Sequence, residues 1–150
     1  MGNIVDDTGL KTVLAGMDIS RQRVVAAAFV EQVLDLAHDE RLKRLQALAG
    51  SAASSEAELR EGYKSAKSIA IESYTQCGKE ADWLAQAGHF VARACAAALA
   101  PAAEGDTLGP AWNAAMYARM ARTSACIGGR AGGGEAEADS QYAIAERLAG

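Results

Sequence analysis

The chain has 150 residues, of which 50% are hydrophobic, and its formal net charge is −4. Thirty-five of the hydrophobic residues are alanine, so only 40 larger apolar residues are available to fill a core. This length and composition predict one domain spanning residues 1–150. The acidic balance argues against a nucleic-acid-binding surface over the whole molecule, and we expect no nucleic-acid partner.

No apolar run has the length of a membrane span. The longest candidate, residues 81–100, is interrupted by Asp82, Gln86, His89 and Arg93, whereas about 20 apolar residues are needed to cross a bilayer. The first seven residues also lack the basic flank and apolar stretch of a secretory signal. We therefore expect a cytoplasmic protein that has no membrane partner.

The cysteines predict neither a disulfide framework nor a metal site. Cys77, Cys95 and Cys126 are odd in number and lie 18 and 31 residues apart, so no CxxC pair is present. We interpret them as reduced, small hydrophobic residues in a reducing compartment. Neither a metal nor another cofactor is expected.

The abundance of alanine determines the expected fold class. Alanine is the strongest helix former and contributes little to a strand, and the only prolines are Pro101 and Pro110. No run of β-branched and aromatic residues alternates with a period of two. The sequence predicts an all-α fold, a compact bundle of about five to seven helices in a single domain.

The N-terminal third predicts three helical elements. Residues 1–17 form an arm or a short helix over residues 8–15, capped by Asp7 or Thr8 and stopped by Gly16. A longer helix begins after Asp18 and runs to about residue 37, and a third begins after Asp39 and ends at residue 50. The apolar residues expected to face the core follow helical spacing: Val25, Phe29, Val33, Leu36, Leu42, Leu45 and Leu48.

The clearest amphipathic helix begins at a capping box, Ser55 to Glu58, and ends at Gly78. Its predicted core stripe consists of Leu59, Tyr63, Ala66, Ala70, Tyr74 and Cys77. The next helix, residues 79–100, carries two adjacent apolar lines and only a narrow polar stripe, so we expect it near the centre of the bundle. The two lines are Trp83, Phe90 and Ala94, and Leu84, Val91, Cys95 and Ala98.

The C-terminal third predicts a loop over residues 101–109 and a helix that begins at Pro110 and runs to about residue 127. Trp112, Met116 and Met120 are spaced by four residues on this helix. The glycine-rich stretch at residues 128–134 has too much backbone freedom to stay helical and is expected to be a flexible connector. A final helix begins at about Glu135.

His89 is the centre of the first candidate site. On a helix it shares a polar stripe with Asp82, Gln86 and Arg93, which could bind an anionic ligand or a charged partner. The alternative is a polar seam that satisfies itself or faces water. No second histidine lies three or four residues from His89, so a metal site is not expected there.

Arginines make the second candidate site. Residues 110–130 contain Arg119, Arg122 and Arg130 and no acidic residue, whereas residues 131–150 carry a net charge of −3. Either the last two helices pair with each other, or the arginines are offered to an acidic partner. The glycine stretch between them lacks the Lys-Ser or Lys-Thr and the preceding strand of a phosphate-binding loop.

No residues form a convincing catalytic constellation. No G-x-S-x-G motif is present, and the predicted position of Cys77 at a helix C-terminus would raise the pKa of its thiol rather than lower it. An enzyme is therefore the minority interpretation.

The order of elements over about residues 25–125 resembles that of the small alanine-rich helical immunity proteins of bacteria. The resemblance rests on a helix ending in Phe29-Val30-Glu31-Gln32-Val33-Leu34-Asp35-Leu36, then Asp39-Glu40-Arg41-Leu42-Lys43-Arg44-Leu45, then several alanine-dominated helices. It implies a cytoplasmic protein that binds and blocks a cognate toxin without a cofactor. Two alternatives stay open. One is a homo-oligomeric adaptor or structural bundle, and the other is a small-molecule-binding or catalytic bundle that uses the polar stripe of His89 and Arg93 together with Trp83 and Tyr74.

Overall fold

The computed structural model describes residues 3–76, 82–101, 108–130 and 132–149. Within these ranges the chain forms α-helices and one short 3₁₀ helix and no strand, which confirms the predicted all-α bundle. The helices are α1 (Asp7–Ala15), α2 (Ile19–Glu31), η1 (Leu34–Leu36), α3 (Glu40–Gly50), α4 (Glu56–Gln76), α5 (Trp83–Leu99), α6 (Gly109–Ile127) and α7 (Gly134–Ala149). None of the described helices is both long and apolar enough to cross a bilayer.

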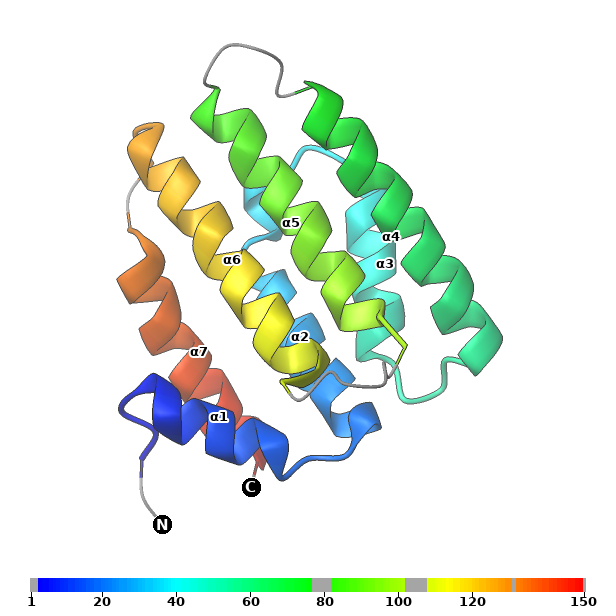
Figure 1. Ribbon diagram of the computed structural model, residues 1–150, viewed down its shortest axis with the longest axis vertical. Coiled ribbons are helices and arrows are strands. Elements are labelled where there is room, and N and C mark those ends of the chain that lie inside the picture. Colours follow the sequence, from blue (N-terminus) through cyan, green and yellow to red (C-terminus); the bar gives the residue numbers. More distant parts are fainter. Residues whose placement is uncertain (1–2, 77–81, 102–107, 131, 150) are drawn as a thin grey trace.

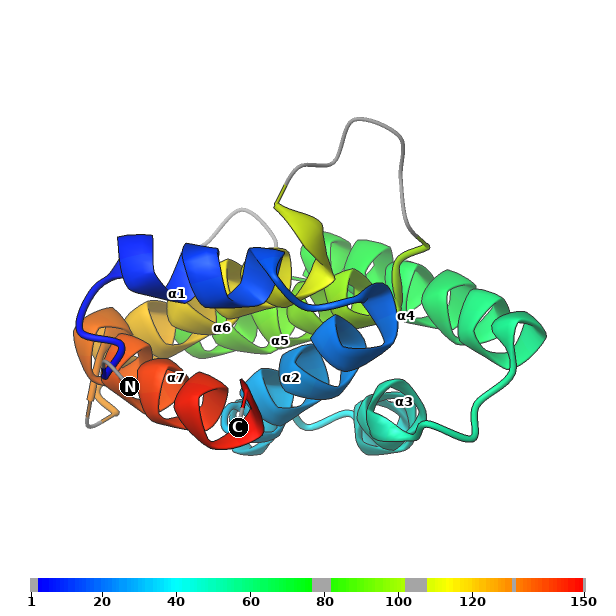
Figure 2. The same ribbon diagram turned by 90° about the horizontal axis from the view of Figure 1, so that it is seen from below.

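The helices form two layers (Figure 1). α4, α5 and α6 lie side by side in one layer, and α7, α2 and α3 lie behind it, as the view from below also shows (Figure 2). α1 packs against α6 and α7 at one edge of the bundle. α5 lies in the middle of the first layer and makes its most extensive contact with α6.

Alanine allows the helices around α5 to approach closely. The side chains of Ala87, Ala92, Ala94 and Ala98 on α5 are fully buried, as are four alanines of α6: Ala111, Ala114, Ala115 and Ala118. The larger side chains come mainly from the second layer and α1, where Phe29, Val30, Leu10 and Leu14 are buried. The predicted central position of the helix near residues 79–100 is confirmed for its described part.

Most helix starts agree with the sequence. Asp18 and Asp39 cap α2 and α3, and each carboxylate accepts a backbone N–H two or three residues later. The Ser55–Glu58 capping box is present, with N–H···O distances of 3.0 and 3.1 Å in its two directions. Pro110 lies in the first turn of α6 as expected.

Two predicted boundaries were wrong. α1 is capped by Asp6 rather than by Asp7 or Thr8, because the carboxylate of Asp6 accepts the N–H of Gly9 at 2.9 Å. The helix predicted to reach residue 37 ends at Glu31, and η1 follows it. At this break the carbonyl oxygen of Gln32 accepts a hydrogen bond from Arg122 Nη2 of α6 at 2.7 Å. Arg122 thereby replaces the backbone N–H that a continuing α-helix would have offered to this carbonyl.

The core stripe predicted for α4 was also partly wrong. Ala66 and Ala70 are buried as expected, but Tyr74 is 67% exposed, and the adjacent Ile69 is only 4% exposed. Cys77, Gly78 and the start of the helix predicted at residue 79 lie outside the described residues, as do residues 102–107 of the predicted loop.

Candidate functional site

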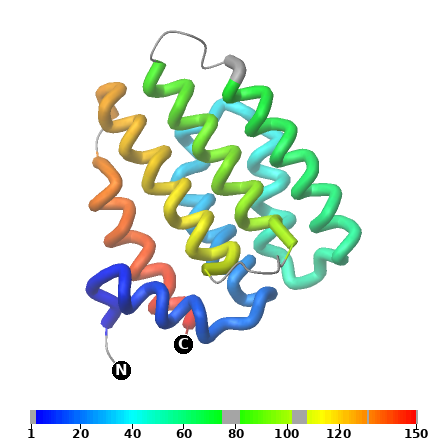
Figure 3. Tube along the Cα trace, viewed as in Figure 1, coloured from blue at the N-terminus to red at the C-terminus, as the bar shows by residue number. Residues whose placement is uncertain are grey.

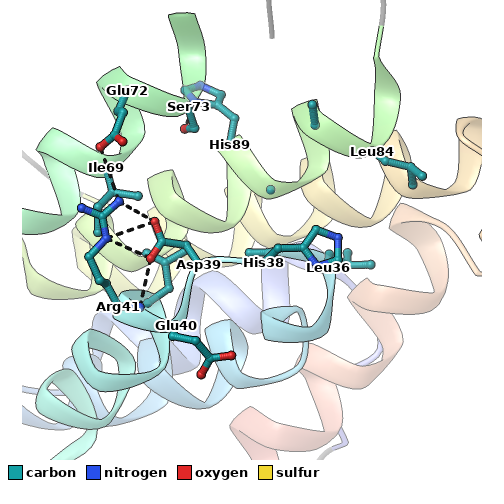
Figure 4. A pocket seen from close by; sticks show the side chains of 14 residues that line it. Leu36, His38, Asp39, Glu40, Arg41, Ile69, Glu72, Ser73, Leu84 and His89 are labelled. Atoms are coloured by element: carbon teal, nitrogen blue, oxygen red, sulfur yellow. Dashed lines mark hydrogen bonds and ion pairs between the residues drawn. The ribbon is translucent and has the colours of Figure 1, made fainter. Parts of the chain in front are cut away.

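A cleft of about 440 Å³ lies where the N-terminus of α3 meets α4 and α5 (Figure 4). One side of it is polar: Arg41 contacts both carboxylate oxygens of Asp39 and also Glu72 of α4. The opposite side is apolar and includes Leu36 and Leu84, with the exposed His38 beside them. The cleft is therefore a shallow, mixed surface with His89 at its inner wall.

His89 is only 6% exposed and joins α4 to α5. Its Nδ1 lies 3.0 Å from the carbonyl oxygen of Ala70 and 3.0 Å from Ser73 Oγ. On the other side of the ring, Arg93 Nε donates to His89 Nε2 at 3.3 Å. Burial, together with the Arg93 cation, lowers the pKa of the imidazole below its ordinary value near 6.5. His89 is therefore neutral at pH 7 and carries its proton on Nδ1.

This arrangement does not activate Ser73. A general base must offer a lone pair to the hydroxyl, but the Nδ1–H of His89 points at the Ala70 carbonyl and at Ser73, and Nε2 faces a guanidinium rather than a carboxylate. Burial also raises the pKa of the Cys95 thiol to about 12, which leaves it protonated. Among the described residues, no group of three His, Cys, Asp or Glu side chains could hold a metal ion.

The predicted polar stripe on α5 is divided by the structure. His89 and Arg93 do meet, but His89 points inward while Arg93 is exposed on the other face of the α4–α5 pair. Asp82 lies before the helix and caps it, and its carboxylate accepts the N–H of Ala85 at 3.1 Å. Gln86 is half-buried. The four residues therefore do not line one common pocket.

Arg119 is bound within the chain. Its guanidinium contacts both carboxylate oxygens of Asp7 at 2.8 and 3.0 Å and donates to Gln141 Oε1 at 2.8 Å. It also lies 5.8 Å from the ring centres of both Trp112 and Tyr142. The hydrogen bond from Arg119 holds the pKa of Asp7 below its ordinary value. Arg119 thus ties α1 to α6 and α7.

Arg122 is also engaged internally, whereas Arg130 is exposed. Arg122 Nε donates to Glu137 of α7 at 3.0 Å, and Glu137 is only 4% exposed. Asp35 lies 3.9 Å from Arg122 Nη2. These contacts are those expected if the last two helices pair with each other. Arg130 contributes its backbone N–H to the carbonyl of Ala125 just after α6.

A second and larger depression, about 690 Å³, is lined by residues of α4, α5 and α6 and by no described residue of α2 or α3. We call it the α4–α6 groove. Its floor is formed by small residues, and its rims by larger ones from α4 and α6. The lining comprises Tyr63, Lys67, Ala70, Ile71, Arg93, Ala96, Ala97, Ala100, Asn113, Met116, Tyr117 and Met120.

The α4–α6 groove is apolar and cationic. Ile71 on one rim is 65% exposed, and Met120 lies exposed on the other. Lys67 Nζ lies 5.3 Å from the ring centre of Tyr63, and the Arg93 guanidinium lies 6.0 Å from that of Tyr117. Because Arg93 is also bonded to His89, its position is fixed before any ligand binds. Among the described residues, no carboxylate lines the groove.

Sequence reasoning found Arg93 but missed the groove. Met116 and Met120 were expected to share a stripe with Trp112, yet Trp112 is buried beside α1 while the two methionines line the groove. One feature of the sequence could have indicated the groove. Ala96 and Ala97 are small residues on α5, and the neighbouring helices α4 and α6 carry the larger aromatic residues Tyr63 and Tyr117. The chain matches no family model, and neither a curated protein nor a solved structure is detectably similar to it.

Proposed function

We propose that this protein binds another protein and that the α4–α6 groove is its binding surface. The observation that carries the proposal is a face of α4, α5 and α6 that no other described helix covers, where exposed apolar rims flank a floor of alanine. No residue of any other described helix lines this groove. Exposed apolar surface of this kind is characteristic of interaction sites.

An amphipathic helix is the occupant that best fits the α4–α6 groove. In helix-in-groove recognition, apolar side chains of the ligand helix anchor between two helices. The alanines on the floor let a ligand approach α5 closely, while Ile71 and Met120 contact its sides. Methionine suits such a surface because its unbranched thioether adapts to different partners.

The local charge favours an acidic partner segment. The whole chain has a net charge of −4, which alone would favour a basic partner, but charges act over only about 8 Å at physiological ionic strength. The described residues that line the groove include Lys67 and Arg93 and no carboxylate. The contacting segment should therefore place an acidic residue opposite these two cations.

Neutralisation of a bacterial toxin is the specific function we propose for this binding. It rests on the resemblance of residues 25–125 to immunity proteins and on a site suited to occlusion rather than to chemistry. A symmetric homo-oligomer is less favourable, because packing two α4–α6 grooves face to face would bring the cations of both copies together.

Growth rescue tests this function. Co-expression with the toxic product of an adjacent reading frame should restore growth, and Ile71→Glu should abolish the rescue, because it buries a charge in the interface. Ile127→Glu is the matched control: Ile127 is 55% exposed, close to the 65% of Ile71, but does not line the groove. Failure of rescue with every adjacent frame would contradict toxin neutralisation.

Small-molecule binding in the His89 cleft is a second candidate. The position of the buried His89 at the wall of a 440 Å³ cleft favours it, although both ring nitrogens already bond within the chain. A ligand that raises the melting temperature of the wild type but not of Leu84→Asp, a change on the cleft wall, would support it. Equal stabilisation of both proteins would contradict it.

A further inference from the structure

A third depression, of about 410 Å³, lies between α3 and α4 and shares no lining residue with the α4–α6 groove. It is lined by Arg41, Arg44, Leu45, Lys64, Ser65, Ser68 and Ile69. Three of these residues are cations, two are hydroxyl donors and none is a carboxylate. This composition is unusual in a chain that has 19 acidic and 15 basic side chains.

α3 and α4 are joined by residues 51–55 and run antiparallel (Figure 3). Near their junction they pack closely, because Gly62 has no side chain: a Cβ there would lie 2.5 Å from Leu48 Cδ2. Further along, Leu45 and Ile69 are buried beneath the depression and Arg44, Lys64, Ser65 and Ser68 are exposed around it.

Of the three cations, Arg44 is the one whose guanidinium forms no ion pair to the described residues and can bind an anion. Arg41 already contacts Asp39 and Glu72, and Lys64 lies 3.5 Å from Glu61 in an exposed pair. Exposed pairs of this kind contribute little and are readily exchanged for a better partner. Arg44 forms no ion pair within the described parts of the chain.

The serines complete a set of donors. Ser65 and Ser68 are three residues apart on α4 and therefore project from the same side of the helix. Serines inside helices often donate to a carbonyl of the preceding turn, as Ser73 and Ser140 do. No such bond is formed by Ser65 or Ser68 within the described residues, so both hydroxyls can donate to a ligand.

From this arrangement we infer that the α3–α4 depression binds a small molecule carrying a phosphate monoester. The guanidinium of Arg44 presents a planar pair of donors that matches two phosphate oxygens, and Lys64 adds a second charge. The hydroxyls of Ser65 and Ser68 supply neutral donors to the remaining oxygen. This site is separate from the α4–α6 groove and does not depend on the function proposed for it.

Titration with glycerol 3-phosphate tests the site, with binding followed through backbone amide NMR shifts at low ionic strength. We expect saturable shifts in residues 44–45 and 64–69. Arg44→Gln should weaken binding about tenfold, the loss of one charge-assisted hydrogen-bonding group. Ser68→Ala should weaken it to a smaller degree.

Lys43→Gln is the matched control. It removes a cation from the neighbouring position of the same helix, but Lys43 pairs with Glu40 and does not line the depression. We expect its affinity to stay within about twofold of the wild type, because an exposed charge outside the site is largely screened. Equal weakening by Lys43→Gln and Arg44→Gln, or shifts that do not saturate, would overturn the proposal.

Discussion

His89 connects the interior of the protein to its surface, since one ring nitrogen contacts α4 and the other holds Arg93. Burial keeps the pKa of this imidazole lower in the folded protein than in the unfolded chain. The unfolded chain therefore binds more protons as the pH falls below about 6.5. The stability supplied by neutral His89 is complete above that pH and is lost as the pH falls through the folded-state pKa.

We predict that the free energy of unfolding in urea decreases between about pH 7.5 and about pH 5.5 and that His89→Gln reduces this decrease. His38→Gln is the control, because His38 is exposed and forms no hydrogen bond or ion pair to the other described residues that is comparable to those of His89; it should retain the wild-type pH dependence. An unchanged pH dependence in His89→Gln would show that another group is responsible.

Arg122 provides a second test among single residues. Arg122→Met would leave Glu137 buried without its cation, which costs about 3 kcal/mol of unfolding free energy. Arg130→Met, a change to an exposed arginine near the same loop, should cost about 0.5 kcal/mol or less. Chemical denaturation measures both. Similar losses in the two variants would contradict a structural role for Arg122.

Single residues also show what the sequence could and could not predict. The caps at Asp18, Asp39 and Ser55 were predictable, because a cap acts on backbone groups two or three residues away. The partners of Arg119 were not, since Asp7 lies 112 residues before it. Only the three-dimensional packing of α1 against α6 brings these two charges together.

The individual helices were predictable in position but less so in orientation. On α4, Ile69 and Tyr74 lie on different sides of the helix, and the sequence alone allows either side to face the core. The structure buries Ile69 against α3 and leaves Tyr74 exposed. Which side of α4 is buried depends on the neighbouring helices, and it cannot be predicted from the hydrophobic periodicity of α4 alone.

The close packing of α6 against its neighbours predicts the effect of a larger side chain at a buried alanine. Ala115 on α6 is fully buried, and its carbonyl accepts a hydrogen bond from Gln141 of α7. Ala115→Leu should lower the free energy of unfolding by about 2 kcal/mol, because a close-packed core has no room for three added carbons. Thermal or chemical denaturation measures the change.

Ala143→Leu is the control for this substitution, because Ala143 is exposed on α7. Its effect should be within about 0.5 kcal/mol. If Ala115→Leu were equally well tolerated, the alanines would not be setting the distance between the helices, and the abundance of alanine would need another explanation.

At the scale of the whole molecule, the structure explains why the chain contains so much alanine. Alanine on the buried sides of α5 and α6 compensates for the small number of large apolar residues, and alanine on the exposed side of α5 forms the floor of the α4–α6 groove. The groove was not predictable from the sequence, because its lining residues come from three helices whose relative rotation depends on tertiary packing.

The central claim is that the α4–α6 groove binds a protein partner. Calorimetric titration of this protein with the product of an adjacent gene tests it most directly. Ile71→Glu should weaken binding by about 2 kcal/mol or more, as expected for an apolar anchor at an interface. Ile127→Glu should change it by about 0.5 kcal/mol or less. Equal affinities of the two variants for the partner would contradict the claim.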